Sequence, residues 1–336
     1  MNFDPTTLHI RQSASITPKY RYNGETDLDE HREKCIKKLS ELLGMDTFTL
    51  CDPIFEITED STENGIRHIH FVLQTEEGYF THCDILVPAN QTSPLPLCVC
   101  LQGHTTGAHI SLAKAKYPQD DEFIHAHDSA FAVRAVEEGF GALAIEQRCF
   151  GQCGGTDNGP ACLRPSSQAL LLGRCTVGER VWDVSRVLDA VEKHFSDILT
   201  LDGSVCVGNS GGGTATYYTA CLEPRFSAYM PSCAVCTFYD SIISIHHCIC
   251  NYVPGIFRYF DMGDMAIMIA PRKLVVVCGK DDPIFPLHGV QETYKIIENC
   301  YRYAGAPENC KLVVGDGPHR FFADDAWPVM KNLLSE

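Results

Sequence analysis

The spacing of hydrophobic residues changes partway along the chain. Residues 1–24 show no period, and we expect them to form an arm on the surface. From Asp27 to Leu43 apolar residues recur at helical spacing, and Gly44 follows as a stop signal, so a helix is predicted there. The segment IRHIHFVLQTEEGYFTHCDILVP (66–88) predicts two strands joined by the polar TEEG, which is a hairpin.

After Pro96 the hydrophobic runs become short and continuous. Continuous apolarity is typical of strands buried on both faces. Strands that alternate with helices indicate a mostly parallel sheet covered on both sides. The predicted strands lie in LCVCLQG (97–103), GALAIEQ (141–147), SVCVGNS (204–210), KLVVVCGKDD (273–282) and CKLVVGDG (310–317). The predicted helices lie in 122–138, 167–194, 213–222, 288–303 and 324–334.

One segment breaks this alternation. Residues 237–262 (TFYDSIISIHHCICNYVPGIFRYFDM) are rich in aromatic residues and are interpreted as an inserted loop or small cap over a site. We expect residues 1–50 to form an N-terminal arm and helix, and residues 51–336 to form a single α/β domain that contains this insertion.

The charge of the chain excludes several classes of partner. The 336 residues carry a formal net charge of −16, which argues against nucleic acids and anionic membranes because both require clustered Lys and Arg. Hydrophobic residues make up 45% and charged residues 21%, as in a globular protein with a sizeable core. No apolar run reaches the roughly 18 residues that span a bilayer.

The cysteines and the first residues suggest a compartment. MNFDPTTLHIRQS has no basic stretch followed by an apolar core, so no secretory leader is expected. Many of the 18 cysteines lie inside apolar runs, where they resemble small buried hydrophobic residues. We therefore expect a reducing, cytoplasmic location. The sequence leaves the oligomeric state open, and a homo-oligomer remains an option.

Ser210 ends a predicted buried strand and stands among glycines in VCVGNSGGG (205–213). The residues Gly208 to Gly212 match G-x-S-x-G, in which a serine occupies a sharp turn between a strand and a helix. Glycines are needed there because neighbouring backbone comes too close for a Cβ atom. The pattern predicts Ser210 as a nucleophile, with a glycine-rich turn without chemistry as the alternative.

A serine nucleophile needs a base, and the base needs an orienting carboxylate. In enzymes with this turn, the order along the chain is serine, acid, histidine. Asp281 and Asp282 follow one later strand, and His319 follows the last one. We expect His319 to be the base and favour Asp282, which precedes Pro283, as the acid; the choice between the two aspartates stays open.

The negative oxygen of a tetrahedral intermediate needs preorganised N–H donors. The backbone N–H of Gly211, directly after the serine, is one candidate. The second is the N–H of His104 or Thr105 in the strand-end loop CLQGHTTGAH, where Gly103 permits the bend. We therefore expect Gly103 and Thr105 to lie beside the substrate and His104 to complete the oxyanion hole.

Taken together in order, several segments resemble α/β-hydrolases of the acetyl xylan esterase and dienelactone-hydrolase-like group. The resemblance covers roughly residues 95–336 and implies an α/β-hydrolase fold with Ser210, Asp282 and His319 as nucleophile, acid and base. Some esterases of this kind carry an Arg-Gly-Gln motif, which EQRCFGQCGG (146–155) keeps with different spacing. The segments are LQGHTTG (101–107), LLLGRCTVGERVWDVSRVLDAV (170–191), GNSGGG (208–213), HHCICNYVPG (246–255), DMAIMIAPRKLVVVCGKDDPIFP (264–286) and GPHRFF (317–322).

The resemblance implies a serine carboxylesterase that hydrolyses short-chain acyl esters through an acyl-enzyme, with acetylated oligosaccharides as candidate substrates. It implies no cofactor. Two alternatives stay open: a peptidase or amidase on the same fold, and a catalytically inactive hydrolase fold that serves as a binding module.

Three further features of the sequence are candidates for function. Arg148 is a candidate substrate-binding residue, with a buried structural role as the alternative. His247 is a candidate to face the pocket. Cys233 and Cys236, followed by the His and Cys residues of 246–250, suggest zinc, but their strand-like context favours buried thiols, so no metal is expected.

Overall fold

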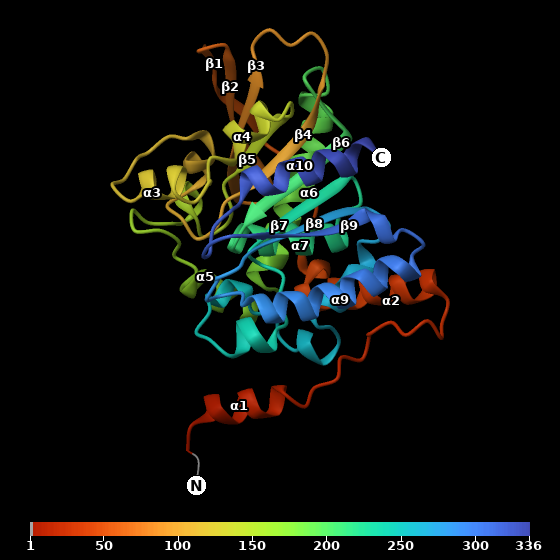
Figure 1. Ribbon diagram of the computed structural model, residues 1–336. Coiled ribbons are helices and arrows are strands. Elements are labelled where there is room, and N and C mark those ends of the chain that lie inside the picture. The colour runs from red at the N-terminus through yellow and green to blue at the C-terminus, as the bar shows by residue number, and fades with distance from the viewer. Residues whose placement is uncertain (1–2) are drawn as a thin grey trace.

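In the computed structural model, which describes residues 3–336, the strands of the described residues form one nine-stranded sheet (Figure 1). The order across the sheet is β1-β2-β3-β5-β4-β6-β7-β8-β9. The strands are β1 (Phe55–Glu63), β2 (Ile66–Glu76), β3 (Tyr79–Pro88), β4 (Leu95–Leu101), β5 (Gly141–Ile145), β6 (Leu199–Asn209), β7 (Ala228–Ser232), β8 (Lys273–Gly279) and β9 (Cys310–Gly315).

The sheet has an antiparallel part and a parallel part. β1, β2, β3 and β5 pair antiparallel, whereas β5, β4, β6, β7, β8 and β9 pair parallel. The predicted hairpin is confirmed as β2 and β3. Because the parallel strands all run in one direction, their carboxyl ends meet at one edge, where ligands bind in such sheets.

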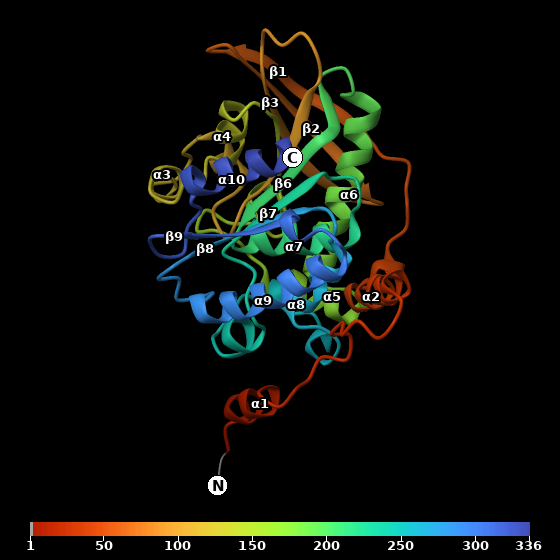
Figure 2. The ribbon, with the colours of Figure 1, turned by 45° about the vertical axis from the view of Figure 1, so that its right-hand side comes forward.

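Helices cover both faces of the sheet (Figure 2). α4 and α10 pack on one face, while α2, α6, α7 and α9 pack on the other. Side chains alternate between the two faces along strand β4. Cys98 and Cys100 face the core beneath α4 and α10, whereas Val99 and Leu101 face the core on the other side of the sheet. The helices are α1 (Pro5–Ser13), α2 (Leu28–Leu43), α3 (Asp120–His125), α4 (Phe131–Glu137), α5 (Leu163–Leu171), α6 (Thr176–His194), α7 (Gly211–Leu222), α8 (Met262–Met265), α9 (Leu287–Tyr303) and α10 (Ala323–Ser335).

Most predicted helices are confirmed, and α2 is capped as expected. The Asp27 carboxylate accepts the Glu30 N–H at 2.9 Å, and Gly44 ends the helix with a φ of 73°. Two predicted helices are each divided: 122–138 into α3 and α4, and 167–194 into α5 and α6. Gly173, with a φ of 79°, lies at the second break.

Two strands and two helices, α1 and the four-residue α8, were not expected. β1 is almost wholly exposed, so its sequence FEITEDSTE has no hydrophobic face that would mark a strand. β7 is buried, but its sequence AYMPS ends in Pro and Ser and lacks the continuous apolar run of the equally short β5. The arm contains α1, which is capped by Asp4 and lies next to residues 239–243 at the bottom of Figure 1.

The inserted segment 237–262 consists of short helical turns. Its aromatic residues Phe238, Tyr252 and Phe257 line a cavity of about 230 Å³ together with Ile16 of the arm. This cavity shares no lining residue with the one that contains Ser210. Across residues 3–336, no helix has the length and apolar character needed to cross a membrane.

Candidate active site

Ser210 occupies the junction between β6 and α7 in a backbone conformation that non-glycine residues rarely adopt. Its φ is 56° and its ψ is −121°. The Ser210 N–H donates to the Ser232 carbonyl of β7 at 2.9 Å, which anchors the turn. A Cβ atom on Gly212 would collide with the Leu101 carbonyl of β4, and one on Gly208 would collide with the backbone of Gly212. The glycines are therefore required by close backbone approach, and the strain falls on the serine.

Asp282 and His319 are brought together by the loops after β8 and β9. His319 Nδ1 lies 2.7 Å from Asp282 Oδ2, so the ring N–H donates to the carboxylate. Asp282 Oδ1 accepts the backbone N–H groups of Ile284 at 2.8 Å and Phe285 at 3.1 Å. Asp281, by contrast, is exposed. Only Asp282 of the two can orient His319 in this arrangement.

The ionisation of Asp282 follows from these contacts. Burial raises the pKa of the carboxyl group, but the hydrogen bond and charge of His319, together with two backbone N–H groups, outweigh it. The net pKa lies below the ordinary value. Asp282 is therefore a carboxylate at neutral pH, the form that orients an imidazole and stabilises its positive charge.

A cavity of about 210 Å³ lies at the carboxyl ends of the parallel strands. Ser210, His319 and the loop after β4 all line this cavity. Its lining residues are Gln102, Gly103, His104, Thr105, Phe123, His127, Ser129, Asn209, Ser210, Ile284 and His319. Two segments far apart in the sequence, the β4 loop and the β9 loop, thus border one small chamber.

Backbone N–H groups point to an anion site beside Ser210. Gly211 is the first residue of α7, where N–H groups have no partner within the helix. The Thr105 N–H is already bonded to the Gly103 carbonyl at 2.8 Å. The His104 N–H has no hydrogen bond within residues 3–336, so it is the better second donor of the two.

His104 lines this cavity and His247 does not, and the rings of both contact residues of the inserted segment 237–262. His104 Nε2 is 3.2 Å from Cys250 Sγ, so this ring nitrogen is engaged by the inserted segment. His247 Nδ1 is 2.9 Å from Asn251 Nδ2, and the His247 ring lies 5.6 Å from the ring of Phe285. His247 Nε2 is buried and has no partner in residues 3–336. It is not among the residues that line the cavity.

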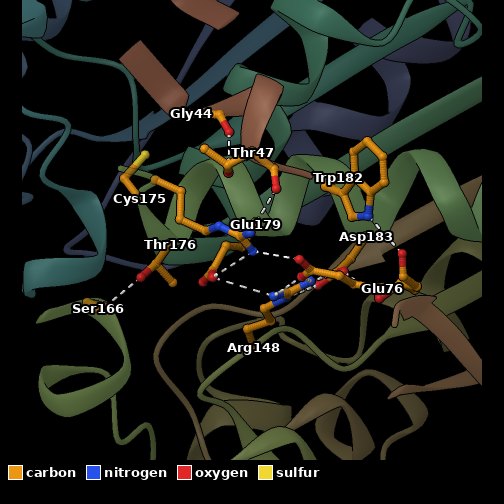
Figure 3. A network of polar contacts seen from close by, with 12 residues as sticks. Gly44, Thr47, Glu76, Arg148, Ser166, Cys175, Thr176, Glu179, Trp182 and Asp183 are labelled. Carbon is orange, nitrogen blue, oxygen red and sulfur yellow. Dashed lines mark hydrogen bonds and ion pairs between the residues drawn. The ribbon is translucent and has the colours of Figure 1, made fainter. Parts of the chain in front are cut away.

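The structure does not bring Arg148 to the cavity. Its guanidinium pairs with both carboxylate oxygens of Asp183 at 2.8 and 2.9 Å, and with Glu76 at 3.1 Å (Figure 3). Glu179 lies 3.4 Å away, and the ring of Tyr79 stacks at 4.0 Å. All three nitrogens of the guanidinium are therefore engaged by carboxylates inside the protein. The expected contact between Arg148 and substrate is not supported, because no N–H is left for one.

Glu146 is a residue that the sequence reasoning missed. It follows β5, is 4% exposed, and its carboxylate accepts the Ala108 N–H at 3.1 Å. Burial raises the pKa of Glu146 to about 7, although the N–H groups of Ala108 and Gln152 act in the opposite direction. The side chain connects the loop after β5 with the loop after β4, which carries His104. The polar run EQR after an apolar strand was the available signal.

Comparison with known proteins agrees with this architecture. No protein-family model matches the chain. The candidate hydrolase YtaP of Bacillus subtilis (strain 168) is 24% identical over 235 residues, which span 69% of this chain and 75% of YtaP.

Solved structures extend the likeness to nearly the whole chain. A candidate acetyl xylan esterase from Bacteroides fragilis superposes with a TM-score of 0.78 at 15% identity, over 94% of this chain and 82% of its own. A glucuronoyl esterase from Solibacter usitatus gives 0.67 at 13% identity, over 96% and 98%. The protein therefore has the α/β-hydrolase fold, as expected.

Proposed function

We propose that the protein is a serine carboxylesterase in which Ser210 is the nucleophile, His319 the base and Asp282 the orienting acid. The observation that carries the proposal is the 2.7 Å contact between His319 and Asp282, on the same cavity as a serine held at a φ of 56°. A strained serine that shares a cavity with an oriented imidazole is the arrangement that acyl transfer requires.

The proposed reaction has two halves. His319 takes the proton of the Ser210 hydroxyl as the oxygen attacks the ester carbonyl, and it returns a proton to the departing alcohol. The N–H groups of Gly211 and His104 stabilise the negative oxygen of the tetrahedral intermediate. Water, deprotonated by His319, then hydrolyses the acyl-enzyme and releases the acid. Asp282 stabilises the imidazolium in both halves.

The size of the cavity and the structural relatives support a substrate class. A volume of about 210 Å³ suits a short acyl group such as acetyl. The acetyl xylan esterase and glucuronoyl esterases among the similar structures are named for esters of carbohydrates. We therefore propose acylated carbohydrates as the alcohol side of the substrate.

The state of the cysteines supports a location. All 18 cysteines lie in the described residues, and none forms a disulfide. We propose a reducing, cytoplasmic setting on this basis.

Hydrolysis of nitrophenyl esters from acetyl to octanoyl tests the proposal, with the wild type beside Ser210→Ala. We expect kcat/KM for the acetyl ester to fall by about 10⁴- to 10⁶-fold in the variant, and wild-type activity to fall steeply with longer chains. Activity in the variant would overturn the assignment of the nucleophile. Activity of the wild type on amides but not esters would favour a peptidase or amidase, and binding without hydrolysis would favour an inactive module.

A further inference from the structure

A cluster of three cysteines and one histidine lies behind the proposed oxyanion loop. His104 comes from the loop after β4, Cys162 immediately precedes α5, and Cys248 and Cys250 flank Ile249 in the inserted segment. One ligand atom from each residue lies within 4.8 Å of each of the others. Four soft donors from three separate segments thus converge on one point.

The separations fit a tetrahedral zinc ion. Zn–S bonds of about 2.3 Å and Zn–N bonds of about 2.0 Å place sulfur ligands about 3.8 Å apart, and sulfur and nitrogen about 3.5 Å apart. Cys248 Sγ and Cys250 Sγ are 3.3 Å apart, and His104 Nε2 is 3.2 Å from Cys250 Sγ. Small outward movements of these side chains would reach zinc geometry. The 3.3 Å between the sulfurs is far too long for a disulfide bond.

A buried arginine supplies an independent argument from charge. Arg180 is 2% exposed, and no carboxylate in residues 3–336 forms an ion pair with it. Its Nη1 lies 3.6 Å from Cys250 Sγ, and its Nη2 lies 3.9 Å from Cys162 Sγ and 3.0 Å from the Arg148 carbonyl. A buried cation needs a compensating anion. Neutral thiols would leave this charge uncompensated.

A zinc ion bound by these four residues would balance the buried positive charge of Arg180. Three thiolates, one neutral imidazole and one Zn²⁺ carry a single net negative charge, which the guanidinium of Arg180 neutralises. Binding would release three thiol protons to solvent and involves no change of oxidation state. We infer that His104, Cys162, Cys248 and Cys250 bind a structural zinc ion, with Arg180 as its charge partner.

This assignment differs from both expectations drawn from the sequence. The sequence favours no metal, and the zinc set that it suggests begins with Cys233 and Cys236. Cys233 Sγ instead contacts the Arg320 carbonyl at 3.2 Å, and Cys236 Sγ contacts the Pro286 carbonyl at 3.9 Å. His246 is exposed. The sequence could not supply Cys162 and His104, because both lie more than 80 residues from the Cys-x-Cys pair.

The ion would fix the position of the oxyanion loop. The His104 ring lies against Gly211, since a Cβ atom there would come within 2.7 Å of the imidazole. Zinc at Nε2 would hold this ring, and with it the His104 backbone, against the inserted segment and the start of α5. Four protein ligands leave no open position, so the ion would not bind substrate. The effect on catalysis rests on the proposed function; the metal site itself does not.

Metal analysis of the full chain tests the inference. The protein is produced with zinc in the medium, purified under reducing conditions without chelator, dialysed, and analysed by plasma mass spectrometry. We expect about one zinc ion per chain in the wild type. Cys248→Ser should lose it, whereas Cys153→Ser, a similarly half-buried cysteine outside the cluster, should keep it. Ser210→Ala should also keep it, which separates this result from failure of the esterase proposal.

A second measurement does not depend on the variant folding. Wild-type protein, stripped of metal and loaded with Co²⁺, should show thiolate-to-cobalt charge-transfer absorption and the intense visible bands of tetrahedral cobalt. The inference is overturned if wild type holds no more zinc than Cys248→Ser, or if cobalt produces no such bands. It is equally overturned if mass spectrometry finds a native disulfide among Cys162, Cys248 and Cys250.

Discussion

Two buried charged groups follow parallel strands of this sheet, β5 and β8, and their surroundings differ in one respect. Arg148, after β5, is enclosed by Asp183, Glu76 and Glu179. Asp282, after β8, is equally buried, but its partner His319 has a second ring nitrogen with no bond within residues 3–336, and it borders a cavity. A buried charge whose partners are all satisfied supports the fold. A buried charge can instead contribute to catalysis when it orients a group, here the imidazole of His319, that keeps one ring nitrogen free beside a cavity.

The largest expected effect removes the orienting charge at the cavity. Asp282→Asn should lower kcat/KM for the acetyl ester by about 10⁴-fold, because the amide no longer selects the ring tautomer or stabilises the imidazolium. Asp281→Asn, one residue away and exposed, is the matched control and should stay close to wild type. Steady-state kinetics on both variants measure the difference. An equal loss of kcat/KM in both variants, or no loss in either, would contradict the assignment of Asp282 rather than Asp281 as the orienting acid.

The next effect removes the enclosed charge. Arg148→Met should lower the free energy of unfolding by about 3–5 kcal/mol, because Asp183 and Glu179 lose their buried counter-charge. Arg186→Met, on the same helix as Asp183, removes a part-exposed pair with Asp189 and a contact with the Trp182 ring but leaves no buried carboxylate unpaired, so it should cost only about 1 kcal/mol. Urea unfolding measures both. A raised KM with unchanged stability would instead restore Arg148 as a substrate-binding residue.

The smallest effect concerns Glu146, which has backbone N–H partners but no counter-charge. Its pKa rises from an ordinary 4.5 to about 7 on folding, because burial disfavours the carboxylate. Between these pH values the folded chain binds more protons than the unfolded chain, so stability falls as pH rises, by up to about 3 kcal/mol. Glu146→Gln should abolish this fall and make the variant more stable than wild type above about pH 7.

Urea unfolding at several pH values checks the Glu146 prediction. Glu137→Gln, an exposed substitution on α4, serves as the control and should leave the slope unchanged. A wild-type slope that persists in Glu146→Gln would show that another group titrates on folding in this range.

Much of the fold was predictable because its signals are local. Continuous apolar runs marked β4, β5, β6, β8 and β9, and a capped amphipathic pattern marked α2. The sequence pattern did not predict β1 and β7, for different reasons. β1 is polar and exposed apart from Phe55, which packs on the core, and it pairs with β2. β7 lacks the continuous apolar run of the equally short β5 and is held between β6 and β8. Pairing across a sheet is a non-local contact that leaves little trace in the sequence of one strand.

The same division applies to the candidate site. The sequence by itself determined which residues could serve as nucleophile, acid and base, because strand ends and the glycine-rich turn are written in consecutive residues. Only the tertiary structure decided that Asp282 rather than Asp281 meets His319, and that Arg148 is enclosed by carboxylates. It also decided that His104 and Cys162 approach the Cys248–Cys250 pair. The reason is physical: a side chain's partners depend on which loops the packed sheet brings together, and separation along the chain does not encode that distance.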